Sequence, residues 1–170
     1  MVALSICLAG DDVERFSVQM RGRLRGWLLA LPAGVGSATA RAVLKLWLFL
    51  PRRWQGVYSA GNGAAMRAPL LGVLFSTQPE TLRRFVSAST RLTHTDPKAE
   101  CAALAAALAA REAAQSRHDP AQFIELLRKE SARFGRDGDE LCDLVERAAR
   151  SADAGESSIA FAQSLGLGHG

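Results

Sequence analysis

Apolar residues recur at helical spacing along most of the chain, whereas the alternation typical of a strand is rare. The region 13–29 shows the pattern, because its apolar residues lie three or four positions apart: Val13, Phe16, Met20, Leu24 and Trp27. This spacing places them on one face of an amphipathic helix. Because similar segments follow to the end of the chain, we predict eight or nine helices, no strand and therefore an all-α fold.

Capping and turn residues set the predicted boundaries of these helices. Residues that can accept a bond from a free backbone N–H group precede four of them: Asp11, Ser37, Asp96 and Asp119. Thr77 and Glu80 have the spacing of a capping box before another. The helices are predicted at about 1–9, 12–29, 38–48, 64–75, 78–89, 97–114, from 120, 138–150 and 159–165, with a loop over 51–63.

Length and composition indicate one globular domain. With 170 residues, 48% of them hydrophobic, the chain can bury a packed core. Aromatic residues make up only 6%, so Leu, Ala and Val must supply most of that core. We predict a single helical domain over 1–165, followed by a tail over 166–170.

Charge and cysteine content narrow the function classes. The net charge is +4, with basic clusters at 21–25 and 52–53, but these clusters lack interleaved aromatic residues that stack on bases. We therefore predict no nucleic-acid partner. The longest apolar run, 44–50, contains a lysine and is too short to span a membrane. The three cysteines lie far apart, which favours reduced, buried thiols in a cytoplasmic protein.

The candidate chemistry begins with the segment Gly61-Asn62-Gly63-Ala64-Ala65-Met66-Arg67. Glycine adopts positive φ without steric cost and asparagine tolerates it, so this loop can turn several N–H groups toward one point. A helix that begins near Ala64 adds its own free N–H groups and the positive end of its dipole. That combination suits a phosphate or another anion. The alternative is a tight turn that only starts a helix.

A second candidate segment, Thr93-His94-Thr95-Asp96-Pro97, precedes the predicted helix at 97–114. Here the ring of His94 and a free backbone N–H group can meet one polar ligand, and histidine changes charge near neutral pH. The alternative is that the threonine and aspartate side chains only cap the helix that follows.

Taken together, the segments 59–67, 69–72 and 93–99 resemble the ADP-ribosylglycohydrolase family in their order, their intervals and the alanine-rich helix that follows. The resemblance covers most of residues 1–165. It implies an all-α fold that binds ADP-ribose or an ADP-ribosylated substrate and hydrolyses the glycosidic bond of that substrate. It also implies these substrate-binding residues: Gly61, Asn62, Gly63, Ala64, Ala65, Met66 and His94. Arg67 is either a phosphate ligand or part of a salt bridge on a helix face.

The family's reaction depends on two magnesium-type ions, held by a Ser/Thr-Asp-Asp segment and an Asp-x-Asp-Thr segment. Neither segment is in its expected place, so we expect a partial chain that begins after the first and ends before the second. The pair at 11–12 lies a helix too late, and Glu140 follows the acids at 137–139 where a hydroxyl residue is required. Both acidic groups are predicted to serve helix starts instead. We assign no metal ligand and no catalytic residue.

The sequence therefore predicts an ADP-ribosylglycohydrolase-like protein that has little or no hydrolase activity as it stands. Two alternatives stay open at this point. One is a module that binds ADP-ribose or a related nucleotide without cleaving it. The other is a structural protein built on the same scaffold, since a fold does not fix a function.

Overall fold

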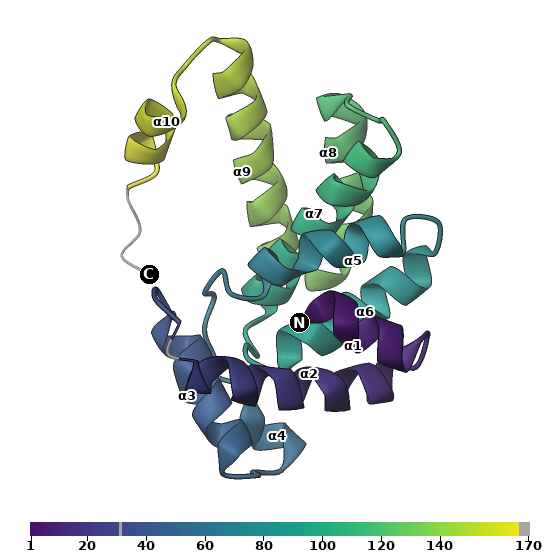
Figure 1. Ribbon diagram of the computed structural model, residues 1–170. Coiled ribbons are helices and arrows are strands. Elements are labelled where there is room, and N and C mark those ends of the chain that lie inside the picture. Colours follow the sequence, from purple (N-terminus) through teal and green to yellow (C-terminus); the bar gives the residue numbers. More distant parts are fainter. Residues whose placement is uncertain (31, 167–170) are drawn as a thin grey trace. The chain divides into compact units, whose positions relative to one another are not determined.

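The computed structural model describes residues 1–30 and 32–166, and this part of the chain is all-α (Figure 1). It contains ten α-helices and two short 3₁₀ helices, and its one β feature is an isolated parallel bridge between Val57 and His94. The predicted fold class is confirmed. Of the predicted tail over 166–170, only Gly166 lies within the described residues.

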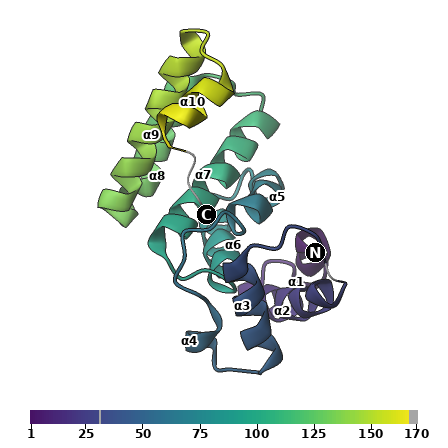
Figure 2. The ribbon, with the colours of Figure 1, turned by 90° about the vertical axis from the view of Figure 1, so that its left-hand side faces the viewer.

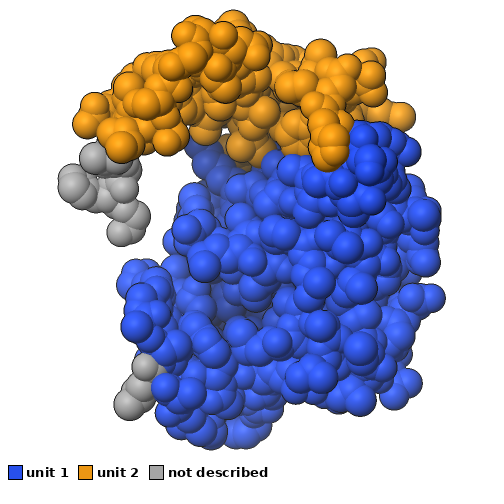
Figure 3. Space-filling model, turned by 45° about the horizontal axis from the view of Figure 1, so that its top comes forward, with its two compact units in different colours: residues 1–117 blue, residues 118–170 orange. Residues whose placement is uncertain are grey.

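The chain forms two compact units, residues 1–117 and 118–170, which Figure 3 colours separately. The first unit contains eight helical elements: α1 Val2–Ala9, α2 Val13–Leu29, α3 Ser37–Trp47, α4 Arg52–Gln55, η1 Ala65–Arg67, α5 Ala68–Leu74, α6 Pro79–Arg91 and α7 Pro97–Ala114. The second contains α8 Pro120–Ser131, η2 Ala132–Phe134, α9 Arg136–Asp153 and α10 Ser158–Ser164. Composition did not indicate this division, and the single domain over 1–165 stays a prediction.

Helix α7 organises the first unit, because η1, α5 and α6 all pack against it. Figures 1 and 2 show α5 and α6 beside α7. Its alanine-rich sequence permits this, since small side chains let a neighbouring helix approach closely. The closest approach is at Gly72 of α5, where an added Cβ atom would lie 1.9 Å from the backbone oxygen of Ala107. The glycine is therefore required by the distance between the two helices.

Three phenylalanines from different elements form the aromatic centre of the first unit. The ring centroid of Phe85 in α6 lies 4.9 Å from that of Phe16 in α2 and 4.6 Å from that of Phe75, which follows α5. The predicted apolar face of α2 is confirmed at its middle positions, where Phe16, Met20 and Leu24 are buried. This aromatic centre joins α2 and the end of α5 to α6.

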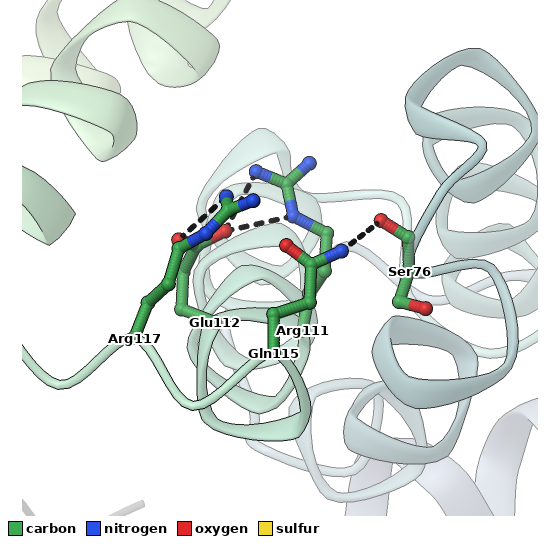
Figure 4. A network of polar contacts seen from close by, with 5 residues as sticks. All are labelled: Ser76, Arg111, Glu112, Gln115 and Arg117. Atoms are coloured by element: carbon green, nitrogen blue, oxygen red, sulfur yellow. Dashed lines mark hydrogen bonds and ion pairs between the residues drawn. The ribbon is translucent and has the colours of Figure 1, made fainter.

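A polar network closes the C-terminal end of α7 (Figure 4). The side-chain amide of Gln115 donates to the backbone oxygen of Ser76, in the turn before α6, over 2.9 Å. The carboxylate of Glu112 pairs with Arg111 at 2.9 Å and with Arg117 at 3.3 Å. The Gln115 bond ties the end of α7 to the α5–α6 turn, and the two ion pairs of Glu112 join residues within and just after α7.

In the second unit, α8 and α9 pack together through small residues. A Cβ atom at Gly138 would lie 2.3 Å from the backbone oxygen of Ser131. The hydroxyl of Ser131 is 3.2 Å from the sulfur of Cys142. The α8–α9 contact therefore depends on a glycine in the same way as the α5–α7 contact.

Several predicted boundaries are corrected by the structure. The loop predicted over 51–63 contains the short helix α4, and the single helix predicted at 64–75 is divided into η1 and α5. The capping box at Thr77 and Glu80 is wrong, because Gln78 is the N-cap residue and makes no side-chain capping bond. Ser37 is the first residue of α3, not its cap. Helix α9 also extends beyond the predicted 138–150 at both ends.

The aspartate caps before proline are confirmed, whereas the cap of α2 is displaced by one residue. Asp96 accepts from the Lys98 N–H, and Asp119 accepts from two N–H groups in α8. At α2, the acceptor is Asp12, not Asp11, with bonds of 2.9 Å and 3.0 Å to the next helical N–H groups. A pair of adjacent aspartates does not reveal from sequence which one has the extended backbone of a cap.

The displaced cap gives a matched pair of variants. Asp12→Ala removes both capping bonds, so we expect it to lower the unfolding free energy by about 1 kcal/mol. Asp11→Ala removes a neighbouring carboxylate that makes neither bond, and it should change the unfolding free energy by less than about 0.5 kcal/mol. Urea unfolding followed by circular dichroism measures both, and equal effects would contradict the assignment of the cap.

Candidate functional site

The two candidate segments lie side by side because a short backbone pairing joins them. The N–H of Val57 donates to the Thr93 oxygen over 3.1 Å, and the N–H of Thr95 donates to the Val57 oxygen over 3.0 Å. This parallel bridge places the loop that leaves Val57 over the residues that end α6. The glycine loop, which we define as residues 59–67, therefore lies against His94.

The two glycines of this loop are required by close contact with neighbouring side chains, not by positive φ. Neither Gly61 nor Gly63 has a positive φ, and neither does Asn62, so the predicted reason for their presence is wrong. A Cβ atom at Gly61 would lie 3.1 Å from Nε2 of His94, and one at Gly63 would lie 2.7 Å from Oγ1 of Thr39 and 3.1 Å from the His94 ring. The loop backbone thus rests on these two side chains.

The predicted substrate-binding residues differ in their exposure. Gly61 and Asn62 are exposed, Gly63 and Ala65 are half-buried, and Ala64 is buried. Met66 is 74% exposed, whereas His94 is 1% exposed. Gly61, Asn62 and Met66 are therefore available at the surface, whereas Ala64 is covered, and His94 supports the loop from beneath. Their role in substrate binding stays a prediction.

His94 is held in one orientation by its neighbour in sequence. Its Nδ1 atom lies 2.8 Å from the Thr93 hydroxyl, which also accepts a 2.9 Å bond from Arg67. Burial lowers the pKa of His94, the positive charge of Arg67 lowers it further, and Asp96 partly opposes both effects. The lowered pKa favours the neutral ring, whose Nε2 is the ring atom nearest to a Cβ position at Gly61.

The lowered pKa of His94 predicts a loss of stability in mild acid. Since the unfolded chain binds this proton near the ordinary pKa of 6.5 and the folded chain binds it only at lower pH, the unfolding free energy falls as pH decreases below 6.5. The contribution of the neutral His94 ring to the unfolding free energy is fully present above pH 6.5. For this one group, the unfolding free energy changes with pH by at most about 1.4 kcal/mol per pH unit. Urea unfolding between pH 7 and 5 should show this slope reduced in His94→Gln and retained in the control His118→Gln, whose side chain is exposed.

Arg67 connects the glycine loop to the end of α6. Its guanidinium donates to the Gly63 oxygen at 2.8 Å, to the Ser89 oxygen at 3.0 Å and to the Thr93 hydroxyl at 2.9 Å. Burial lowers its pKa to about 10, so it stays protonated at neutral pH. Among the described residues, no carboxylate forms an ion pair with it. The alternative of a salt bridge on a helix face is therefore wrong, and the guanidinium faces the protein interior.

Two features of the site were missed in the sequence. Thr39 lies in α3, far from the loop along the sequence, and no pattern of residues indicates its contact with Gly63. The second was visible: no Asp or Glu occurs between Glu14 and Glu80, a stretch that contains nine of the 21 Lys and Arg residues. The glycine loop lies within this stretch.

The residues that the structure describes do not fit the binuclear magnesium site that the family implies. Within 1–30 and 32–166, no group of three or more His, Cys, Asp and Glu side chains is placed to hold a metal ion. The carboxylate of Asp12 caps α2. Asp137 and Asp139 lie in the first turn of α9, where the helix dipole favours acids. We therefore derive no chemical step through a metal ion.

All three cysteines are free, and only two of them match the predicted burial. Cys101 and Cys142 are buried, whereas Cys7 on α1 is exposed.

Over the described part of the chain, no helix combines the length and the apolar character that crossing a membrane requires.

The fold and the site define an all-α protein in which a surface glycine loop rests on a buried histidine. The sequence profile of the ADP-ribosylglycohydrolase family matches residues 1–169, and the chain belongs to this family. Searches of curated proteins and of solved structures each gave no significant match. The match to the family profile confirms the family assignment made from the two motifs.

Proposed function

We propose that this protein binds the ADP-ribosyl group of its substrate at the glycine loop, with the diphosphate next to the N–H groups of residues 63–65. The observation that carries the proposal is the loop itself, exposed at Gly61 and Asn62 and supported from beneath by His94. Membership of the family supports ADP-ribose as the ligand. The acid-free stretch around the loop supports an anion.

The family's reaction is hydrolysis of the glycosidic bond to ADP-ribose, and we propose that this chain as it stands catalyses it weakly or not at all. The support is the placement of its candidate carboxylates, since Asp12 caps α2 and Asp137 and Asp139 lie in the first turn of α9. The cytoplasm is the proposed location, as the free cysteines suggest.

Isothermal titration calorimetry with ADP-ribose tests the binding proposal. We expect saturable binding to one site per chain, and much weaker binding of adenosine, which lacks the diphosphate. The absence of heat with ADP-ribose, in a sample that circular dichroism shows to be helical, would remove the proposal. A folded protein that binds neither compound would instead favour the structural role.

A turnover assay tests the second part. The protein is incubated with magnesium and an ADP-ribosylated peptide, and released ADP-ribose is measured by chromatography. We expect release close to that of a protein-free control. Robust release that increases with protein concentration would contradict the proposed loss of activity.

A further inference from the structure

The carbonyl group of Gly63 is bound by a side chain where a helix would use its own backbone. In an α-helix, the N–H of residue 67 bonds to the oxygen of residue 63. Here η1 is a 3₁₀ helix, so the N–H of Arg67 donates to the Ala64 oxygen over 3.1 Å, and that of Met66 donates to the Asn62 oxygen. The Gly63 oxygen lies between these two acceptors and receives the Arg67 guanidinium at 2.8 Å.

This arrangement determines where three consecutive N–H groups point. In a trans peptide the N–H and C=O groups point in opposite directions, and the described chain contains no cis peptide bond. The carbonyls of residues 62, 63 and 64 all accept bonds from η1. The N–H groups of residues 63, 64 and 65 therefore point away from the Met66 and Arg67 groups that donate to these carbonyls. The middle one, on Ala64, depends on Arg67 for its direction.

Arg67 can hold this carbonyl because the rest of its guanidinium is fixed elsewhere. One nitrogen, Nη2, donates both to the Ser89 oxygen and to the Thr93 hydroxyl, while Nη1 reaches Gly63. The Ser89 oxygen belongs to the last turns of α6, where the negative end of the helix dipole favours a cation. A planar fork spans these acceptors at once, whereas the compact ammonium group of lysine cannot.

We propose that Arg67 is a positioning residue of the glycine loop: by binding the Gly63 carbonyl, it turns the Ala64 N–H group toward the anion that the loop binds. The proposal rests on the proposed function, namely that this loop receives the diphosphate of ADP-ribose. Arg67 itself does not contact the ligand. Its charge lies behind the loop without a carboxylate partner among the described residues, and it polarises the peptide group that donates to the anion.

Three variants test this role by calorimetry with ADP-ribose. Arg67→Lys keeps the charge and loses the fork, and Arg67→Met loses both. We expect the Kd for ADP-ribose to increase at least tenfold in each. Arg84→Met is the matched control, because Arg84 is an exposed arginine on α6, and its Kd should stay within twofold of wild type.

A measurement on the ligand-free protein separates orientation from charge. The ¹³C shift of the Gly63 carbonyl and the ¹⁵N shift of Ala64 report the hydrogen bonding of this one peptide group. Both should change in Arg67→Lys and stay the same in Arg84→Met. If Arg67→Met fails to fold, Arg67→Lys and Thr93→Val, which removes one acceptor of the fork, replace it.

The outcomes distinguish the inference from the function on which it rests. Wild-type affinity in Arg67→Lys, or unchanged Gly63 and Ala64 shifts, overturns the positioning role while ADP-ribose binding stands. Failure of the wild-type protein to bind ADP-ribose overturns the proposed function, and the positioning role falls with it. Loss of affinity in Arg67→Lys together with changed shifts supports both.

Discussion

Replacing Gly72 with alanine is expected to lower the unfolding free energy by about 3 kcal/mol or more, or to prevent folding. The added Cβ atom would lie 1.9 Å from the backbone oxygen of Ala107 and 2.8 Å from its carbonyl carbon. These are backbone atoms in the middle of α7, so they cannot rotate away as a flexible side chain can. Helix α5 would have to separate from α7, and the buried contact of Leu71 would be lost with it.

The control for this prediction is another glycine-to-alanine change within a helix. Gly26 lies in α2, where a Cβ atom would meet nothing within 4 Å. Gly26→Ala should raise the unfolding free energy by about 0.5 to 1 kcal/mol, because alanine loses less backbone entropy on folding. Urea unfolding measures both variants. A Gly72→Ala protein as stable as wild type would contradict the close packing of α5 against α7.

Replacing Gly63 with alanine is expected to weaken ADP-ribose binding at least tenfold. Its Cβ atom would lie 2.7 Å from Oγ1 of Thr39 and 3.1 Å from the ring of His94, so the loop must lift from the surface that supports it. Lifting the loop breaks the 2.8 Å bond between the Gly63 oxygen and Arg67. We expect a loss of about 1 to 3 kcal/mol in unfolding free energy as well, the usual range for overpacking.

A double variant shows whether the contact beneath the loop is the cause. Thr39→Ala removes the atom nearest the added methyl group. The pair Gly63→Ala and Thr39→Ala should therefore recover part of the affinity that Gly63→Ala loses, although the His94 contact persists. Calorimetry measures the Kd for ADP-ribose of Gly63→Ala, of Thr39→Ala and of the double variant. If Gly63→Ala binds ADP-ribose with wild-type affinity, the close packing of Gly63 on Thr39 and His94 is contradicted. If the double variant recovers no affinity, the loss comes from contact between the added methyl group and the ligand instead.

The helical architecture was predictable because it depends on local signals. The three- and four-residue spacing identified α2 and its buried residues, and Asp-Pro pairs identified the starts of α7 and α8. The two motifs also identified the family and the loop. What these signals share is that each lies within a few residues of the feature it determines.

The remaining features depend on contacts between distant segments. The sequence indicates Gly63 as a candidate through its conformational freedom, yet its contact with Thr39 of α3 is what requires a glycine. The sequence predicts Arg67 at a phosphate or in a salt bridge, but the Ser89 and Thr93 oxygens that bind it are brought near only when α6 and η1 both pack on α7. A sequence pattern shows neither the Gly63–Thr39 contact nor the distances from Arg67 to these oxygens.

The central claim is that the N–H groups of residues 63–65 bind the diphosphate of ADP-ribose, and ¹H–¹⁵N correlation spectra of the labelled protein test it most directly. We predict saturable shifts of the Gly63, Ala64 and Ala65 amide signals as ADP-ribose is added. The same signals should move little with adenosine. Amide signals of the loop that do not respond to ADP-ribose, or that respond equally to adenosine, would contradict the account.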